Sequence, residues 1–376
     1  MRMTTYHTPD ELCAAARAAG RVAVPDTGAS SALVAQFLKA EGVCVTAENP
    51  QLTVFTAPAP DAPDAPDACI VSGALQDALA ALVPVHLDFM CPGFAKCGTT
   101  TLQEVLIQDP DCYLPPAKET FFLQWYQKTP DATRVLRTRH YRRVRPGQKA
   151  GCIEPSHYNR AKDAFEYFGS GMKILFMVRN PAEAEFSYFR MLARNIYRDK
   201  HLDLFKTCRR FGPQMFDLYV EREVKPGYDK RFAYDRWISE YLKYFPKENV
   251  KVVLFEDMLK NPRASLDDIQ TFLGLTPLPF GRLPHANEGK SVSRGYLAAR
   301  VNLALFKIDE KLKSRPINRF VRFYQRYIKR AVFAFTLKKD DSKLTPEAKT
   351  ALTAHFMPSI RRLETIIGRS LEGVWY

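Results

Sequence analysis

Residues 93–101, GFAKCGTTT, combine the residue types that bind phosphate groups. Gly93 and Gly98 allow a tight backbone turn, so the amides that follow would point inward at the start of a helix, where the helix dipole favours an anion. The ammonium group of Lys96 and the threonine hydroxyls add donors that an ordinary strand–turn–helix connection does not need. The predicted binding loop consists of Gly93, Phe94, Ala95, Lys96, Cys97, Gly98, Thr99, Thr100 and Thr101.

The position of the lysine distinguishes two classes of ligand for this loop. In an ATP-binding P-loop the lysine directly follows the second glycine, and the next Ser or Thr binds magnesium. Here Lys96 stands two positions before Gly98, although the run KVVLFED at 251–257 could pass as the acid-ended strand of an ATPase. A ligand with a single 5′-phosphate and no metal therefore fits the loop better.

A second anion-binding pair follows the apolar run at 173–178. Arg179 ends this predicted strand, Asn-Pro turns the chain, and Ser187 lies one or two turns into the next helix. The guanidinium and the hydroxyl can converge on one anion, because both donate hydrogen bonds. Taken alone, Arg179 could equally form a salt bridge, and Ser187 could be a hydroxyl on a helix surface.

Together, GFAKCGTTTL and KILFMVRNPAEAEFSYF resemble the two signatures of sulfotransferases that use 3′-phosphoadenosine 5′-phosphosulfate (PAPS), and the resemblance covers roughly residues 86–376. It implies that the loop binds the 5′-phosphosulfate and that Arg179 and Ser187 bind the 3′-phosphate. It also implies that Lys96 stabilises the leaving group and that no metal is required. Family members close a basic loop over the 3′-phosphate, which corresponds here to NEGKSVSRGYL. Its candidate ligands are Lys290, Ser293 and Arg294, with a surface turn as the alternative.

Two residues compete for the role of the base that removes the acceptor proton. Glu119, in LPPAKETFFLQWY, matches the glutamate that carbohydrate sulfotransferases place before paired aromatics. His157, in GCIEPSHYNR, resembles the catalytic histidine of small-molecule sulfotransferases, although the Lys-Thr-His motif of that histidine lacks its lysine here. A histidine titrates near neutral pH, whereas a glutamate needs a raised pKa. The resemblance favours Glu119. Secondary candidates for binding the sulfo group or orienting the acceptor are Lys118, Glu154 and Ser156.

The order of apolar runs predicts an α/β fold with a central parallel sheet. The candidate residues stand at the carboxyl ends of the predicted strands, where such sheets bind ligands. The resemblance assigns residues 85–376 to a sulfotransferase-type P-loop fold. The strands are expected at 87–93, 150–155, 173–180 and 251–257.

Residues 1–84 show a separate βαβ-type pattern and are predicted to form a small Rossmann-like accessory domain. A helix capped by Thr8 is expected at 8–20, and the pattern then predicts strands in RVAVP, VCVTA and LTVFTA. The Pro/Asp/Ala-rich segment 57–68 predicts a stiff loop or linker.

Charge and composition limit the binding partners and the cellular location that can be expected for the protein. The net charge of +14 is strongest at 315–339, where Arg and Lys alternate with aromatics. This stretch could contact an acidic glycan, a nucleic acid or a membrane surface. Peripheral membrane contact is possible through it, and binding of nucleic acid is not expected. The alternative is a surface helix whose aromatics pack inward. The eight cysteines lack metal-ligand spacing, and no run is apolar enough for a signal peptide or membrane span. A cytoplasmic location is therefore expected.

The sequence thus predicts a PAPS-dependent sulfotransferase that acts on a hydroxyl, on a carbohydrate or glycan. Three alternatives remain open: a small alcohol or phenol as acceptor, a P-loop kinase or NTPase, and a non-catalytic glycan-binding protein of the same fold.

Overall fold

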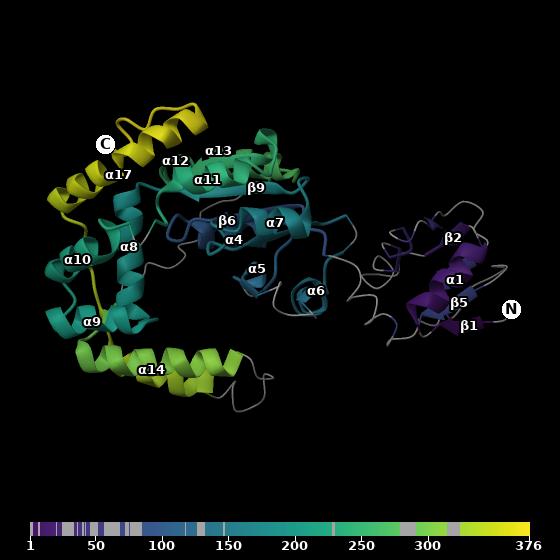
Figure 1. The fold of residues 1–376 in the computed structure, drawn as a ribbon, viewed down its shortest axis with the longest axis horizontal. Coiled ribbons are helices and arrows are strands. Elements are labelled where there is room, and N and C mark those ends of the chain that lie inside the picture. Colours follow the sequence, from purple (N-terminus) through teal and green to yellow (C-terminus); the bar gives the residue numbers. More distant parts are fainter. Residues whose placement is uncertain are drawn as a thin grey trace.

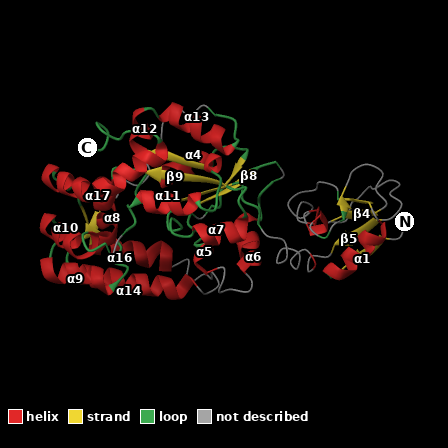
Figure 2. Ribbon diagram, turned by 45° about the horizontal axis from the view of Figure 1, so that its top comes forward, coloured by secondary structure: helices red, strands yellow, loops and turns green. Residues whose placement is uncertain are grey.

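The structure is a computed structural model, shown in Figures 1 and 2. It describes residues 3–6, 8–19, 21–24, 34–35, 37–39, 41, 43–45, 52–55, 68–71, 75, 85–116, 118–125, 132–145, 147–227, 230–278, 291–313 and 324–376.

The larger part of the chain is built on a five-stranded sheet in which all neighbouring strands run parallel (Figure 1). Its order is β10 (Val250–Leu254), β9 (Lys173–Val178), β6 (Phe89–Gly93), β8 (Lys149–Ile153) and β7 (Cys112–Tyr113). The central strands are continuous apolar runs because helices cover both faces of such a sheet. The strands expected from the sequence are confirmed, whereas the two-residue strand β7 was not anticipated.

Helices flank this sheet and continue beyond it (Figure 2). Their bounds are α4 (Thr99–Leu106), α5 (Phe122–Trp125), α6 (Ala132–Val135), α7 (Ala161–Phe168), α8 (Pro181–Arg194), α9 (Asp199–Cys208), α10 (Pro213–Tyr219), α11 (Tyr234–Leu242), α12 (Phe255–Lys260), α13 (Pro262–Leu273), α14 (Tyr296–Lys313), α16 (Lys329–Thr336) and α17 (Pro346–Ile367). Short π-helical segments are Leu136–Tyr141, Val220–Val224 and Tyr324–Ile328, and Lys247–Asn249 is a 3₁₀ turn. None of the described helices combines the length and hydrophobicity that crossing a bilayer requires.

Helices α10, α14 and α17 pack against α8. This helix leads away from the sheet to α9 and α14, and α17 packs on both α8 and α11 (Figure 1). An antiparallel pair, β11 (Ser291–Ser293) and β12 (Leu337–Lys339), lies against α8. In the described part of 315–339 Tyr324 is buried, but Tyr327 and Phe335 are exposed, so its aromatics do not all pack inward.

The N-terminal part has a second five-stranded parallel sheet and a hydrophobic core of its own. The strand order is β1 (Met3–Tyr6), β5 (Ala68–Val71), β4 (Leu52–Phe55), β2 (Arg21–Ala23) and β3 (Cys44–Val45). Helix α1 (Pro9–Ala19) begins as predicted: the Thr8 hydroxyl accepts the Glu11 amide at 3.3 Å, and the Glu11 carboxylate accepts the Thr8 amide. Strand β1 was not anticipated, and the predicted linker lies outside the described residues except for Ala68. That this part acts as an accessory domain stays a prediction.

Candidate functional site

The loop between β6 and α4 turns through left-handed backbone conformations. Lys96 and Gly98 have φ angles of 67° and 91°. Gly98 must be glycine for a second reason, because a Cβ atom there would lie 2.5 Å from a ring carbon of Phe255. The aromatic ring of Phe255 thus closes one side of the loop, and the amides that begin α4 follow directly from this turn.

Lys118 is bound to the start of α4. Its Nζ donates to the Oγ1 atoms of Thr99 and Thr100, both at 3.0 Å. The sequence left open whether this lysine contacts the loop, because the spacing of 18 and 19 residues carries no such information. Lys118, from a separate segment, therefore contacts the loop that carries Lys96.

Lys96 lies in a group of cations. Burial lowers its pKa, and the positive charges of Lys118 and Arg179 lower it further. No carboxylate of the described residues forms an ion pair with Lys96. Because like charges held together raise the free energy of the site, the group is electrostatically complementary to an anion of more than one negative charge.

Arg179 stands at the corner between β9 and α8, as the sequence predicts. Its guanidinium is 3.3 Å from the carboxylate of Glu183 and 5.2 Å from the centre of the Phe255 ring. The carbonyl of Arg179 accepts a hydrogen bond from the Tyr234 hydroxyl at 2.8 Å. Arg179 therefore forms the salt bridge that the sequence left open as its alternative role, and its charge also acts on Lys96.

Asn180 fixes this corner from three directions. Its Oδ1 accepts the amides of Ala182 and Glu183 and thereby caps α8. Its own amide donates to Glu256 at 2.8 Å, and its Nδ2 donates to the Trp375 carbonyl at 2.8 Å. Glu256, which follows β10, thus holds the corner that carries Arg179 in place.

Ser187 and Arg190 lie further along α8. Ser187 is partly exposed. Arg190 was not singled out in the sequence; its Nε lies 3.2 Å from the carboxylate of Asp340, and its charge also lowers the pKa of Lys96. Arg190 is therefore a further cation of the site, and its partner, 150 residues away, could not be read from the spacing.

The Glu154 carboxylate holds the segment that carries Lys118 and Glu119. Its Oε1 accepts the hydroxyl of Thr120 at 2.6 Å and also the Thr120 amide, and its Oε2 accepts the Phe121 amide at 3.2 Å. Burial raises the pKa of Glu154 to about 7, and the hydrogen bonds from Thr120 oppose this shift. Glu119 and Phe121 both have positive φ, so these bonds fix a tightly turned segment.

The two candidate bases differ in accessibility. The Glu119 side chain is 35% exposed, and its carboxylate lies 3.9 Å from Nζ of Lys118. The His157 side chain is 1% exposed, 4.0 Å from Glu154, and its ring nitrogens have no hydrogen-bond partner among the described residues. Burial lowers the pKa of His157 to about 3, so its ring is neutral. The structure places Glu119 at the surface of the site and His157 in the interior.

The remaining predicted residues are distributed unevenly. The side chains of Phe94 and Cys97 are buried, so only their backbone can face a ligand; burial raises the pKa of Cys97 to about 12. Ala95 and Thr101 are partly exposed.

Arg294 is exposed and lines a shallow recess of about 530 Å³ with Lys206 and Arg209, a group that includes none of the loop residues. Lys290 lies outside the described residues.

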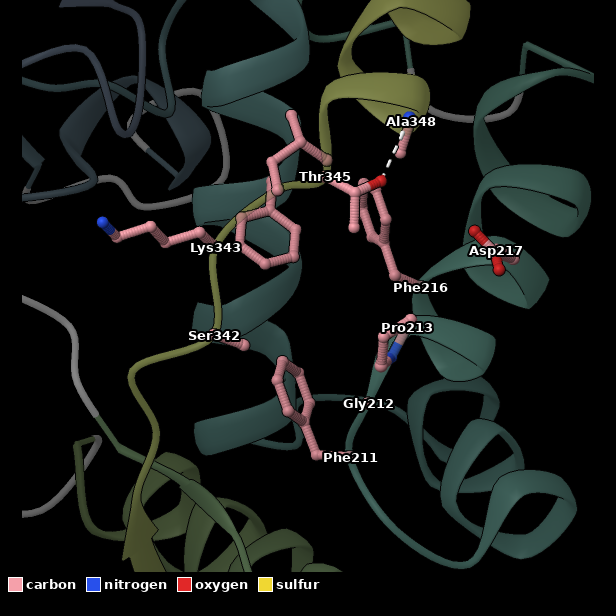
Figure 3. A pocket seen from close by; sticks show the side chains of 11 residues that line it. Phe211, Gly212, Pro213, Phe216, Asp217, Ser342, Lys343, Thr345 and Ala348 are labelled. Atoms are coloured by element: carbon pink, nitrogen blue, oxygen red, sulfur yellow. Dashed lines mark hydrogen bonds between the residues drawn. The ribbon is translucent and has the colours of Figure 1, made fainter.

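A second hollow, of about 90 Å³, lies between α8, α10 and the segment before α17. Phe211 and Phe216 face it, and the hydroxyl of Thr345 accepts the Ala348 amide at its edge (Figure 3). Its lining is largely apolar and includes none of the predicted site residues, so it is distinct from the anion-binding loop.

A parallel α/β sheet with cations and a glycine loop at its strand ends is an arrangement suited to phosphate-type anions. The model of the sulfotransferase domain matches residues 87–283, more than half of the chain, and the chain belongs to this family. It is therefore a sulfotransferase enzyme, and the family resemblance and the sulfotransferase-type fold with its central parallel sheet are confirmed; the Rossmann-like character of residues 1–84 stays a prediction.

Solved structures with an overall likeness are sulfotransferases as well. The sulfotransferase from Alicyclobacillus acidocaldarius is 21% identical, with 77% of this chain and 98% of that chain covered and a TM-score of 0.49. Mouse sulfotransferase SULT7A1 complexed with PAP is 16% identical, with coverages of 74% and 85% and a TM-score of 0.38. The sulfotransferase domain from the Synechococcus PCC 7002 olefin synthase is 14% identical, with coverages of 73% and 95% and a TM-score of 0.35. Comparison with curated proteins gave no match.

Proposed function

We propose that the enzyme transfers the sulfuryl group of PAPS to a hydroxyl of a carbohydrate or glycan and releases adenosine 3′,5′-bisphosphate. The observation that carries this proposal is the group of Lys96, Lys118 and Arg179, in which Lys96 has no carboxylate partner among the described residues. PAPS carries phosphate groups at both ends of its ribose, which matches two sets of cations on neighbouring strands.

In this proposal the loop amides, Lys96 and Lys118 bind the 5′-phosphosulfate, and Arg179 with Ser187 binds the 3′-phosphate. Lys290 and Arg294 are retained as ligands of a closing loop. The acceptor oxygen attacks sulfur in line as the bond between sulfur and the bridging oxygen breaks, and the electron pair of that bond stays on the phosphate. Lys96 stabilises the negative charge that develops there.

Glu119 is proposed as the base that takes the acceptor proton. Its side chain is 35% exposed, whereas that of Glu154 is 2% exposed, and Lys118 lies next to the Glu119 carboxylate. Glu154 is proposed to position this segment, since it accepts three hydrogen bonds from Thr120 and Phe121. A role for His157 as the base would require its buried, neutral ring to become accessible.

The alternatives are retained with the features that favour them. A small alcohol or phenol as acceptor goes with His157 as the base. A kinase would need the loop to bind the β,γ-phosphates of ATP, which the position of Lys96 before Gly98 disfavours. A non-catalytic glycan-binding protein would bind the bisphosphate product without turnover.

The test is calorimetric titration with adenosine 3′,5′-bisphosphate, in parallel with ATP and magnesium. Wild type, Arg179→Ala and Arg263→Ala are compared, since Arg263 is exposed and paired with Asp267 away from the loop. We expect metal-free binding of the bisphosphate that weakens about 100-fold in Arg179→Ala, because charge-assisted bonds are lost, and is unchanged in Arg263→Ala. Binding of ATP with magnesium alone would refute the proposal.

A further inference from the structure

Helix α14 turns an apolar stripe to solvent. Leu297, Val301 and Ile308 are exposed by 72%, 43% and 43%. Their spacing of four and seven residues places them on one face of the helix, and the opposite side, with Ala299 and Leu303, is buried. A soluble helix normally carries polar residues on its outer face, so this stripe requires an apolar partner.

The neighbouring helix α16 extends the same kind of surface. It packs beside α14 at one edge of the molecule (Figure 2). Phe335, with 80% of its surface exposed, is the most exposed large apolar side chain among the described residues, and Tyr327 and Ile328 are also exposed. Aromatic and aliphatic side chains of this kind partition into the boundary between lipid headgroups and acyl chains.

The stretch of sequence that carries these apolar side chains is rich in basic residues. Residues 296–339 contain twelve Lys and Arg but two Asp and Glu, so they carry +10 of the net charge of +14. Arg300 lies over the Tyr296 ring and Lys329 over the Phe333 ring. One described cation of α14 is paired, since Lys307 lies 3.4 Å from Asp199. At the Leu297 end of the stripe, Lys206 and Arg209 line the shallow recess described above.

We propose that the face formed by α14, α16 and the preceding turn Tyr324–Ile328 docks on an anionic membrane surface. The apolar stripe enters the headgroup boundary, while the long basic side chains reach the negative headgroups. A second copy of the chain is a poorer occupant, because a two-fold contact through this face would bring its cations against their own copies. The inference does not depend on which acceptor the enzyme uses.

The test measures binding of the full-length protein to vesicles by flotation. One set is phosphatidylcholine alone, and the other contains about one third phosphatidylglycerol, so that only the second is anionic. We expect binding to the anionic vesicles that is at least about tenfold stronger than to the neutral ones and that weakens with salt. The triple variant Leu297→Ser, Val301→Ser, Phe335→Ser should lose at least about tenfold in binding, because the apolar contact with the bilayer is lost.

The control changes two equally exposed apolar residues outside this face, Ile107→Ser and Leu259→Ser, whose exposed fractions are 48% and 58%. A separate double variant, Arg300→Glu with Arg330→Glu, removes positive charge from the proposed face. It should weaken binding to anionic vesicles only, and it tests the proposal even if the triple variant unfolds. Absence of wild-type binding to anionic vesicles, or an equal loss in the control, would overturn the proposal. So would a triple variant that changes the sedimented mass of the free protein without changing vesicle binding, which would identify a second copy as the occupant.

Discussion

The chain contains two five-stranded parallel sheets, and the residues that follow their strands differ in charge. In the larger sheet, Lys96 follows β6, Arg179 follows β9, and Glu154 follows β8. In the sequence of the N-terminal part, Lys39 is the only Lys or Arg between Arg21 and His86. Residues 1–84 hold four Lys and Arg against nine Asp and Glu, so this part is acidic while the rest of the chain is strongly basic.

This difference shows that parallel sheet topology supplies positions for a site but not its chemistry. Both sheets bring the carboxyl ends of their strands to one edge. The proposed anion site lies at one of these edges, where glycines, lysines and arginines follow the strands. The comparison predicts that turnover is sensitive to residues of the larger sheet's edge and insensitive to comparable residues of the N-terminal part.

The largest effect is expected from Lys96→Ala. Removing the cation that stabilises the leaving group should lower kcat by about 10³-fold, the scale of losing a preorganised charge-stabilising group. Lys39→Ala, an exposed lysine of the N-terminal part, is the matched control and should leave kcat unchanged. The measurement is the steady-state rate of bisphosphate release. A similar loss in both variants would break the comparison between the two sheets.

The next largest effect is expected from Glu119→Ala. Loss of the base should lower kcat by about 10²-fold, as general-base catalysis contributes on this scale, while calorimetric affinity for the bisphosphate stays the same. His157→Asn is measured alongside it. If Glu119→Ala keeps full activity and His157→Asn loses it, the choice of base is wrong and the small-molecule alternative gains support.

The third prediction compares the stability costs of Gly98→Ala and Gly147→Ala. The comparison distinguishes the cost of a close contact with Phe255 from the cost of backbone strain. Gly98 and Gly147 both have left-handed φ angles, 91° and 83°, but a Cβ at Gly98 would meet Phe255, whereas a Cβ at Gly147 would meet nothing within 4 Å. Gly147→Ala should cost about 1 kcal/mol of unfolding free energy from strain alone. Gly98→Ala should cost roughly 2 kcal/mol or more and weaken bisphosphate binding. Denaturant unfolding and calorimetry measure both; equal costs would contradict the contact with Phe255.

The last effect expected is a pH dependence of stability, and it comes from Glu154. Because its folded-state pKa is raised to about 7 from 4.5, the folded protein binds more protons than the unfolded chain between these pH values. The contribution of Glu154 to stability therefore falls as pH rises through this window, by at most about 1.4 kcal/mol per pH unit. Glu154→Gln removes this contribution, so the variant should gain stability relative to wild type from pH 4.5 to 7.

The quantity to compare is the difference in unfolding free energy between wild type and Glu154→Gln. Their separate pH profiles are less informative, because His157 changes the stability of both in the opposite direction. Its lowered pKa of about 3 makes stability fall as pH drops from 6.5 towards 3 in both proteins. Unfolding curves at four pH values across the window give the difference directly. A constant difference at all pH values would mean that the pKa of Glu154 is the same in the folded and the unfolded protein, which would contradict the raised pKa.

The sequence was sufficient to predict the features that are local. Apolar runs located β6, β8, β9 and β10, since buried parallel strands are continuous in hydrophobicity. The glycine–lysine–threonine loop was equally visible, because its donors are consecutive. Strand β1, MTTY, is short and half polar, and β7 has two residues, so neither rises above the background of loops.

Contacts between distant residues could not be predicted in the same way. Lys118 reaches the threonines of α4, Glu154 reaches Thr120, and Arg190 reaches Asp340 through the tertiary fold alone. Spacing gives no signal for such pairs without a known fold. Whether Phe335 points outward was likewise left open, because alternating cations and aromatics at 315–339 fit both a surface contact and an inward-packed stripe.

The hydrogen bond from Asn180 to the carbonyl of Trp375 affects the order in which parts of the site can fold during synthesis. It joins residues 195 positions apart, and it fixes the corner that presents Arg179. At a synthesis rate of 5–20 residues per second, roughly 10–40 s pass between the two residues. The glycine loop and its strands can therefore form on the nascent chain well before the arginine corner, which waits for the last residues to fold back.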